Sequence, residues 1–269
     1  MQEITDIKDI QSIALNILIY VDDICKKNNI RYSLAGGTAI GAIRHKGFIP
    51  WDDDIDIMMP RPDYEKFLKI MDNSENKNFK ALHYGANFPN YFYGFTKVVD
   101  LNTKLYESTL INNPDLGVFI DVFPIDGAPH NINKLLKKYK KYQSLTTLAS
   151  MKKFAKSSKG KLRTLLKFPS YLFAKIFGWK FWYKRKLKII EKCDYDKCDK
   201  SIILDDVCAI KALMDKNIYD EYINVPFENC NASILKDYDI YLTSIYGDYM
   251  TPPPKEKQIA PHIFKIYRK

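Results

Sequence analysis

A chain of 269 residues is long enough to bury the core of one large domain, and its 46% hydrophobic content excludes a disordered protein. Its formal net charge of +10 is compatible with nucleic acid, anionic membranes or phosphorylated substrates as partners. The sequence has no basic leader followed by an apolar stretch and no apolar run of about 18 residues, so neither a secretory signal nor a transmembrane helix is expected. The five cysteines form no framework, which predicts reduced thiols in the cytoplasm.

The N-terminal part of the chain begins with a helical pattern. Apolar residues recur at three- and four-residue steps over residues 4–27, as in an amphipathic helix. Residues 30–34 are predicted to form a strand that runs into a glycine pair. Thr38 is expected to cap a short helix that ends at His45.

An acidic strand follows the loop 47–53. Residues 54–58 alternate between acids and apolar residues, which places the carboxylates of Asp54 and Asp56 on one face of a strand. Divalent cations prefer such carboxylate oxygens. A solvated acidic loop would account for Asp52, but not for the alternation that follows it.

Asp63 is predicted to cap the helix that follows this strand, after Pro60 and Pro62 end the strand. Further strands are expected around Gly, Asn and Pro turns at 79–83, 91–99, 103–106 and 118–123. In the last of these, Asp121 lies among aromatic residues on an otherwise apolar strand. A buried carboxylate is costly unless it is paired or bound to a cation, so Asp121 is the predicted third ligand.

The middle of the chain is helical and strongly basic. Lys and Arg alternate with aromatic and apolar residues up to about residue 192, and Pro169 is predicted to divide the pattern into two helices. Two interpretations of this basic region remain open. It either docks on an anionic membrane or is a structural insert whose cations face water. We predict one domain, with its core from 1–130 and 200–269 and a helical insert at about 131–199.

The order of these features resembles a known arrangement. A strand, a glycine pair, a helix, an Asp-x-Asp strand and a later strand with one Asp resemble the nucleotidyltransferase fold of the DNA polymerase beta superfamily. The gap between Gly37 and Asp54 is longer than that superfamily's pattern usually allows. The gap itself is informative, because the stretch LAGGTAIGAIRHKGFIPWDDDIDIMMPRPDYEKF is similar to the signature of the LicD family of phosphocholine transferases, which decorate bacterial cell-surface glycans. Further matches are KVVDLNT (97–103), GVFIDVFPIDGAP (117–129), DYDIYLTSIYGDYMTPPP (237–254) and His262.

This resemblance implies an α/β (α+β) fold with a nucleotidyltransferase-like mixed sheet flanked by helices. It also implies a phosphotransferase that uses Mg²⁺, or Mn²⁺ in its place, held by Asp54, Asp56 and Asp121. The donor would be CDP-choline or a related CDP-activated compound, and CMP would leave. The acceptor would be a sugar hydroxyl of a lipid-linked precursor of teichoic acid, lipopolysaccharide or capsule.

The resemblance further implies roles for residues around the glycine pair. Backbone amides at Gly36 and Gly37 would hold phosphate oxygens, and Thr38 would add a hydroxyl contact. Arg44 and Lys97 would supply positive charge to the same phosphates.

The roles of His45 and Asp53 remain open, and further candidates come from a family motif and from aromatic residues. His45 suits acid–base work or a structural position at a turn, and Asp53 suits a general base or a supporting position. Asp126 falls within the family motif and is expected to cap a turn. Trp51 is the first candidate for an aromatic face against a quaternary ammonium group. The remaining aromatic candidates are Tyr84, Phe88, Tyr91, Phe92, Tyr93, Phe95, Tyr246 and Tyr249.

Two other functions are kept as alternatives. One is transfer of another group, such as phosphoethanolamine, glycerol phosphate, ribitol phosphate or a nucleotide. The other is a non-catalytic membrane- or nucleic-acid-binding protein, although the intact acids argue against it, and no nucleic-acid partner is expected. The predicted location is the cytoplasm, with peripheral contact to the inner face of the bacterial membrane.

Overall fold

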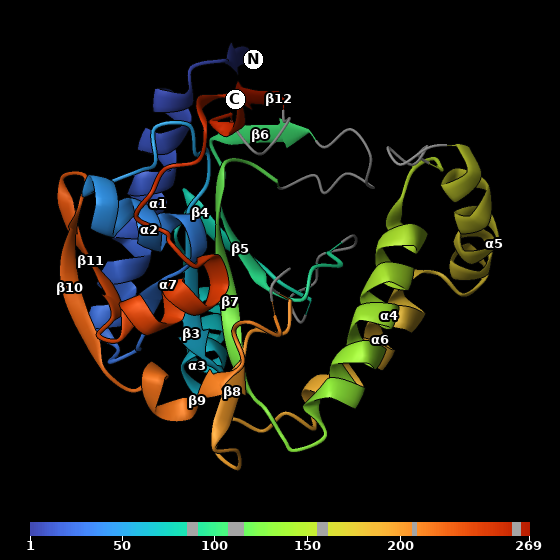
Figure 1. Cartoon of the computed structure of the whole chain (residues 1–269). Coiled ribbons are helices and arrows are strands. Elements are labelled where there is room, and N and C mark those ends of the chain that lie inside the picture. Colours follow the sequence, from blue (N-terminus) through green and yellow to red (C-terminus); the bar gives the residue numbers. More distant parts are fainter. Residues whose placement is uncertain (85–90, 107–115, 155–160, 206–208, 260–264) are drawn as a thin grey trace.

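The structure is a computed structural model that describes residues 1–84, 91–106, 116–154, 161–205, 209–259 and 265–269. A mixed sheet lies at the centre, with α1, α2 and α7 on one side and the helices α4 to α6 extending from the other (Figure 1). The predicted α/β fold, with a mixed sheet and flanking helices, is confirmed. None of the described helices is both long and apolar enough to cross a membrane.

The central sheet follows the order β2-β3-β7-β5-β4. Its strands are β2 (Ser33–Leu34), β3 (Asp56–Pro60), β7 (Phe119–Gly127), β5 (Thr96–Asp100) and β4 (Phe79–Leu82). β3 runs parallel to β7, whereas β2, β5 and β4 pair antiparallel with their neighbours. β7 and β5 are buried almost throughout. The burial of β7 agrees with its mainly apolar sequence, whereas β5 is buried although Thr96, Lys97 and Asp100 are polar. β7 extends beyond the residues predicted for it, and its last residues pair with β8 (Lys200–Ile202), which pairs with β9 (Met214–Asp215).

Amphipathic helices cover this sheet. They are α1 (Ile7–Lys27), α2 (Gly36–His45), α3 (Arg61–Asp72) and α7 (Tyr238–Tyr246). α1 packs on β5 and β7 through Ala14, Ile17, Leu18 and Val21, each of which is fully buried. Burying an aliphatic side chain of this size stabilises a fold by about 1.5–3 kcal/mol, so α1 is a major part of the main core.

The two ends of the chain meet in a second sheet that the sequence did not reveal. β1 (Gln2–Ile4) pairs with β12 (Lys265–Arg268), and β12 pairs with β6 (Thr103–Tyr106), both antiparallel. A separate hairpin is formed by β10 (Tyr222–Phe227) and β11 (Cys230–Leu235). The hairpin is fixed to the central sheet by Ser33, whose Oγ accepts a hydrogen bond from the Leu235 N–H at 2.9 Å. Short 3₁₀ turns lie at Lys216–Tyr219 and Lys255–Lys257.

The basic middle of the chain forms three helices, α4 (Ile132–Ser150), α5 (Lys161–Phe177) and α6 (Trp179–Ile190). α4 packs along α6, and two small apolar clusters lie between these helices and their neighbours. The prediction that Pro169 divides this region is wrong, because Pro169 lies inside α5. The break falls at Gly178, whose φ of +73° lies in the left-handed region that glycine adopts readily. The division of the chain into a core and an insert remains a prediction.

Two predicted helix caps are also wrong. Ala35 takes the N-cap position of α2, and Thr38 lies inside the helix, where its Oγ1 accepts a hydrogen bond from the Asp56 N–H at 2.9 Å. Asp63 lies in the first turn of α3, but its carboxylate accepts hydrogen bonds from the N–H and Nε of Arg31 at 3.1 and 2.9 Å. Both side chains therefore connect distant segments instead of satisfying the backbone of their own helix.

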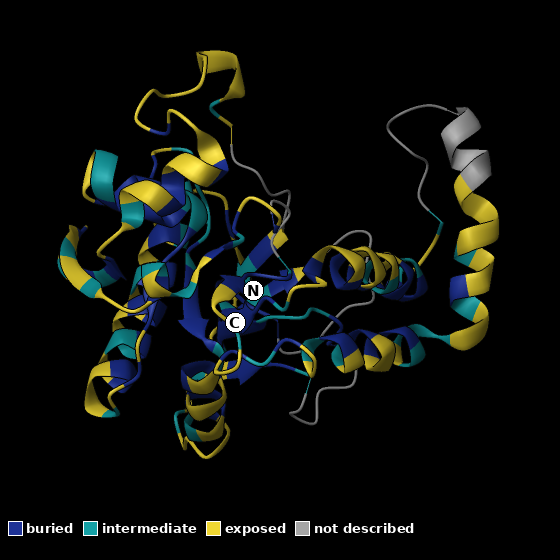
Figure 2. Ribbon diagram, turned by 60° about the horizontal axis from the view of Figure 1, so that its bottom comes forward, coloured by how far each residue is buried: buried dark blue, intermediate teal, exposed yellow. Residues whose placement is uncertain are grey.

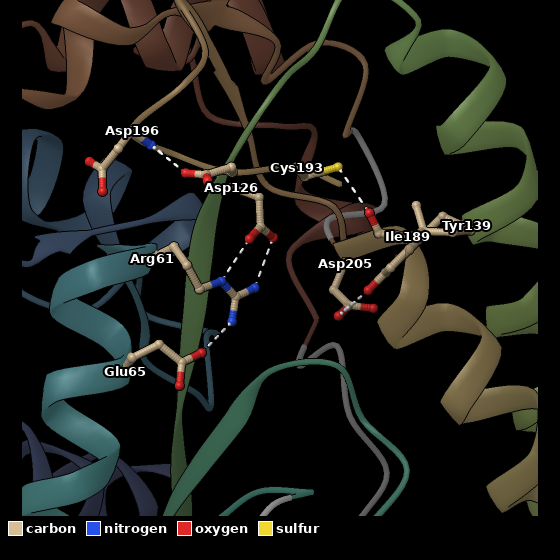
Figure 3. A network of polar contacts seen from close by, with 9 residues as sticks. Arg61, Glu65, Asp126, Tyr139, Ile189, Cys193, Asp196 and Asp205 are labelled. Atoms are coloured by element: carbon tan, nitrogen blue, oxygen red, sulfur yellow. Dashed lines mark hydrogen bonds and ion pairs between the residues drawn. The ribbon is translucent and has the colours of Figure 1, made fainter. Parts of the chain in front are cut away.

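Asp126 is a strand residue and not the predicted turn cap. It lies in β7 and is 1% exposed, and it accepts hydrogen bonds from Nε and Nη2 of Arg61 at 2.7 and 2.9 Å (Figure 3). Arg61 also donates to Glu65 one turn along α3. Burial raises the pKa of Asp126, while the Arg61 guanidinium opposes that rise. The forked pair fixes the start of α3 against the end of β7.

Replacing Asp126 with Ala should lower the free energy of unfolding by about 3 kcal/mol, because the buried end of Arg61 loses its counter-charge. Urea unfolding monitored by circular dichroism measures this. The matched control is Asp23→Ala, which breaks an exposed pair with Lys27 and should change stability by less than about 0.5 kcal/mol. Equal effects of the two substitutions would show that the Arg61 pair does not stabilise the fold.

Candidate active site

Two acids and a lysine meet on three adjacent strands of the central sheet. In the parallel register of β3 and β7, Asp56 lies opposite Asp121, and in the antiparallel register of β5 and β7, Lys97 lies opposite Asp121. Side chains at directly paired positions lie on the same face of a sheet. The strand pairing therefore gathers three charged residues from distant parts of the sequence.

Lys97 and Asp121 form a buried ion pair. The Lys97 Nζ lies 2.7 and 3.0 Å from the two carboxylate oxygens of Asp121 and 3.4 Å from the centroid of the Phe119 ring. Lys97 is 4% exposed, so its charge needs these partners. That Lys97 contacts a phosphate stays a prediction, and in the structure its ammonium group pairs with Asp121.

Asp56 lies at the centre of a group of carboxylates. Burial raises the pKa of Asp56 well above its usual value, and the charges of Asp54, Asp121 and Asp52 raise it further, while Lys97 opposes them. Several negative charges thus converge on the carboxyl group of one half-buried residue. Such an arrangement is unfavourable without a positive charge beside it, and it suits a divalent cation.

The turn before β3 brings three more carboxylates together. One oxygen from each of Asp52, Asp53 and Asp54 lies within 4.8 Å of the others, and all three residues are half-buried. The Gln11 side chain fixes this turn by donating a hydrogen bond to the Asp52 carbonyl at 2.8 Å. The sequence had suggested a solvated loop for Asp52, but its charge acts on Asp56. The prediction that Asp54 lies in the strand is wrong, because β3 begins at Asp56. The charge of Asp54 nevertheless acts on Asp56.

The glycine turn lies against these acids. Gly36 has a φ of +54°, and a Cβ there would lie 3.2 Å from the Asp56 Oδ2 and 3.4 Å from the Tyr246 hydroxyl. A Cβ on Gly37 would lie 2.8 Å from the Asp52 Oδ2. The first residues of α2 therefore approach the carboxylates more closely than a larger residue allows. Backbone N–H groups at such a helix start are suited to phosphate oxygens.

Arg44 and His45 lie at the opposite end of α2, about 14 Å along the helix from Gly36. The Arg44 Nε donates a hydrogen bond to the His45 Nε2 at 2.9 Å, and its Nη1 donates to the Tyr249 carbonyl at 2.9 Å. Burial and then the Arg44 charge lower the pKa of His45, which favours neutral imidazole. These contacts connect α2 to the C-terminal motif, and the acid–base role of His45 stays a prediction.

The aromatic candidates divide between several places. Trp51 packs half-buried against the main core, and Tyr249 donates a hydrogen bond to Asp239. Tyr84 stacks on Tyr183 of α6 with ring centroids 4.0 Å apart. Tyr93 contacts both Tyr91 and Phe92, and Phe92 also contacts Trp179. Phe88 and His262 lie outside the described residues.

A cavity of about 270 Å³ lies beside Asp56. Its lining residues come from the glycine turn, β3, the position just before β5, β7, the segment after β8, and α7. They are Ala35, Gly36, Asp56, Phe95, Phe123, Ile203, Asp205, Tyr241 and Tyr246. Of the aromatic candidates, Phe95 and Tyr246 therefore reach the acids. Phe123 and Tyr241 do so as well, although sequence reasoning had not singled them out.

Asp205 was also missed, since no motif surrounds it. It accepts a hydrogen bond from the Tyr139 hydroxyl at 2.7 Å (Figure 3). It also accepts one from the Gln143 amide at 2.8 Å, and the Lys186 Nζ lies 3.4 Å away. Lys186 is 1% exposed, and burial lowers its pKa while Asp205 opposes that change. This network joins α4 and α6 to the wall of the cavity. A larger cavity of about 570 Å³ lies nearby between α3 and α6, and Arg61 and Asp126 line it.

The chain is similar to known proteins over this whole arrangement. Residues 29–143 match the family described as LicD/FKTN/FKRP, nucleotidyltransferase domain. A lipopolysaccharide cholinephosphotransferase, LicD, of Haemophilus influenzae is 33% identical over 99% of this chain and 99% of its own length. Shorter matches occur to uncharacterised proteins of Rickettsia typhi, 38% identical over 23% of this chain and 20% of that protein, and of Rickettsia prowazekii, 39% identical over 21% of each.

The region of the family match contains the glycine turn, the acidic turn and the three charged strands, and the Haemophilus relative extends the similarity to both ends of the chain. These findings confirm the family that the sequence motifs predicted. The chain therefore belongs to the LicD family of phosphocholine transferases.

Proposed function

We propose that this protein transfers phosphocholine from CDP-choline to a sugar hydroxyl of a lipid-linked glycan precursor and releases CMP. The observation that carries the proposal is the convergence of Asp54, Asp121 and Asp52 on the half-buried Asp56, beside a glycine turn at the start of a helix. The similarity to a lipopolysaccharide cholinephosphotransferase supports the choice of group and acceptor. Teichoic acid and capsule precursors are acceptors of the same chemistry.

The carboxylates fit Mg²⁺, or Mn²⁺ in its place. Asp54, Asp56 and Asp121 would hold the ion, and Asp52 lies close enough to join them. The fit rests on the mutual repulsion of these acids around Asp56, which a dication relieves, and on their oxygen ligands. When bound, such an ion neutralises charge on the leaving phosphate and lowers the pKa of the attacking hydroxyl.

The protein's own residues position the reactants. Lys97 holds the carboxylate of Asp121 through both oxygens, and Thr38 fixes the start of β3 through the Asp56 N–H. The N–H groups that open α2 would hold phosphate oxygens beside Gly36. In the transfer, the acceptor oxygen bonds to the phosphorus that carries choline, and the bond from that phosphorus to the oxygen of CMP breaks. A carboxylate of the 52–54 turn, with Asp53 as the sequence candidate, would take the hydroxyl proton.

Replacing Asp56 with Asn should reduce transfer by about 10²–10³-fold, because it removes a charge at the point where the acids converge. The protein should remain folded, since the side-chain volume is kept. CMP release measures the loss of activity, and the rise in melting temperature on adding Mg²⁺ measures the loss of metal binding. Both should fall together, and chelation should inactivate the wild-type protein.

The matched control for this substitution is Asp23→Asn on the exposed face of α1. It should keep both the activity and the Mg²⁺-dependent rise in melting temperature. Full activity of Asp56→Asn, or of the wild-type protein after chelation, would overturn the metal assignment.

A panel of donors tests the transferred group. We expect CMP release from CDP-choline in the presence of a glycan acceptor to exceed release from CDP-ethanolamine, CDP-glycerol and CDP-ribitol by at least about tenfold, as an aromatic face favours a quaternary ammonium group. A preference for one of the other donors would replace phosphocholine by that group. Pyrophosphate release from a nucleoside triphosphate would instead indicate a nucleotidyltransferase.

Contact with the membrane is the last part of the proposal, and α5 supports it. Figure 2 shows α5 far from the main sheet with most of its described residues exposed. Its exposed apolar side chains recur at helical spacing, opposite the buried Ala174, and they are Phe168, Leu172, Phe173, Ile176 and Phe177.

Positive charge borders both ends of this apolar face. At one end Phe168 contacts Phe154, which follows the exposed Lys152 and Lys153. At the other end Phe177 stacks on Phe181, and the Arg185 guanidinium lies 4.5 Å from the centroid of the Phe181 ring. An apolar helix face with a cationic border is suited to an anionic lipid surface.

The double substitution Leu172→Glu and Ile176→Glu should reduce binding to phosphatidylglycerol vesicles by at least about tenfold in co-sedimentation, because two apolar side chains no longer enter the lipid. The control Ile259→Glu alters another highly exposed residue, 70% exposed against 78% for Ile176, and should have no effect. Absence of vesicle binding by the wild-type protein would refute the proposal. A concentration-dependent dimer that the double substitution dissolves would assign this face to a second copy of the chain.

A further inference from the structure

The cavity beside Asp56 has walls that are mostly aromatic. Phe95 and Phe123 lie on one side with ring centroids 4.5 Å apart, and α7 contributes Tyr241 and Tyr246. The Tyr246 hydroxyl approaches the glycine turn, since a Cβ on Gly36 would lie 3.4 Å from it. The aromatic cavity therefore opens directly beside the position proposed for the phosphates.

The size of the cavity limits its occupant. Sites for drug-sized ligands occupy about 300–1,000 Å³. At about 270 Å³, this cavity is too small for a whole CDP-activated donor, but it suits one end of such a molecule. Because Asp56 is part of its wall, the end that enters is a group attached to the reacting phosphate.

The charge of the cavity favours a cation. Asp56 and Asp205 both line it, and aromatic faces attract cations through their ring electrons. The two lysines nearby are already paired, Lys97 with Asp121 and Lys186 with Asp205. A quaternary ammonium group has no N–H to donate, so aromatic faces with acids beyond them match it better than hydrogen-bond acceptors do.

We propose that this cavity holds the trimethylammonium end of the donor and that Phe95 and Phe123 determine the preference for choline over smaller amines. The inference rests on the proposed function and adds the residues that select the head group. Trp51, the first candidate from the sequence, is not among the described residues that line the cavity. The aromatic faces come instead from Phe95 just before β5, from Phe123 in β7, and from α7.

The test compares two donors that differ in the methyl groups on nitrogen. Phe95→Leu and Phe123→Leu are made separately, and both positions are half-buried, so the fold should tolerate them. The ratio of kcat/KM for CDP-choline to that for CDP-ethanolamine should fall by about tenfold in each variant. Tyr246→Leu, at a position 48% exposed, gives a third variant with the same expected direction.

The matched control is Phe79→Leu, a half-buried position on β4 that packs on Tyr20 away from the cavity. It should leave the ratio of the two donors unchanged. An equal loss with both donors in the cavity variants would overturn the inference, because it would assign the cavity to the cytosine base or to a structural role.

A binding measurement separates this inference from the proposed function. Tetramethylammonium chloride should raise the melting temperature of the wild-type protein more than sodium chloride at equal ionic strength, and Phe95→Leu should abolish the difference. If no CDP-activated donor is used, the proposed function fails, while this shift still decides whether the cavity holds a quaternary ammonium group. Equal shifts with both salts in the wild-type protein would refute the cavity assignment.

Discussion

The parallel pairing of β3 with β7 is the constraint on which the site depends. It places Asp56 opposite Asp121 inside a sheet whose other residues are mainly apolar. Like charges at such close range, away from water, oppose folding unless positive charge is brought to them. Lys97, paired with Asp121 from the other neighbouring strand, supplies one such charge within the protein itself. The charges of Asp54 and Asp52 act on Asp56 together with that of Asp121, and the mutual repulsion of these carboxylates is what a bound dication would relieve.

The same principle organises the region where the basic helices meet the sheet. Asp126 is paired with Arg61 of α3, and Asp205 lies between Tyr139, Gln143 and Lys186 of α4 and α6. Burying these groups in pairs gives little net stability, but it makes the alternatives costly, because a shifted helix would leave a charge unpaired. The helices α4 and α6 are thus oriented toward the wall of the cavity, although they contribute none of the acids around Asp56.

Local patterns were enough to predict the parts of the site that are close in sequence. The glycine pair, the acidic turn and the apolar run around Asp121 each have a spacing that reports directly on backbone geometry. What the sequence did not reveal depends on pairing between distant segments. The Lys97–Asp121 ion pair depends on the register of β5 against β7. The pair between Arg61 and Asp126 forms only when α3 packs on the sheet. β12 is a strand because it pairs with β1 and β6. Thr and Asp are common helix caps, but the side chains of Thr38 and Asp63 accept hydrogen bonds from distant segments instead.

The fold also explains why the family motifs fall at both ends of the chain. α7 lies against α2, so Tyr241 and Tyr246 of the C-terminal motif line the cavity that begins at Gly36 of the N-terminal motif. The Arg44 contact to the Tyr249 carbonyl fixes the far end of the same pair of helices. The two motifs therefore form two sides of one site. The N-terminal motif contributes the glycine turn and the acids, and the C-terminal motif contributes aromatic surface. A donor that carries charge of both signs needs both sides at once, because neither the acids nor the aromatic wall alone distinguishes its head group from its phosphates.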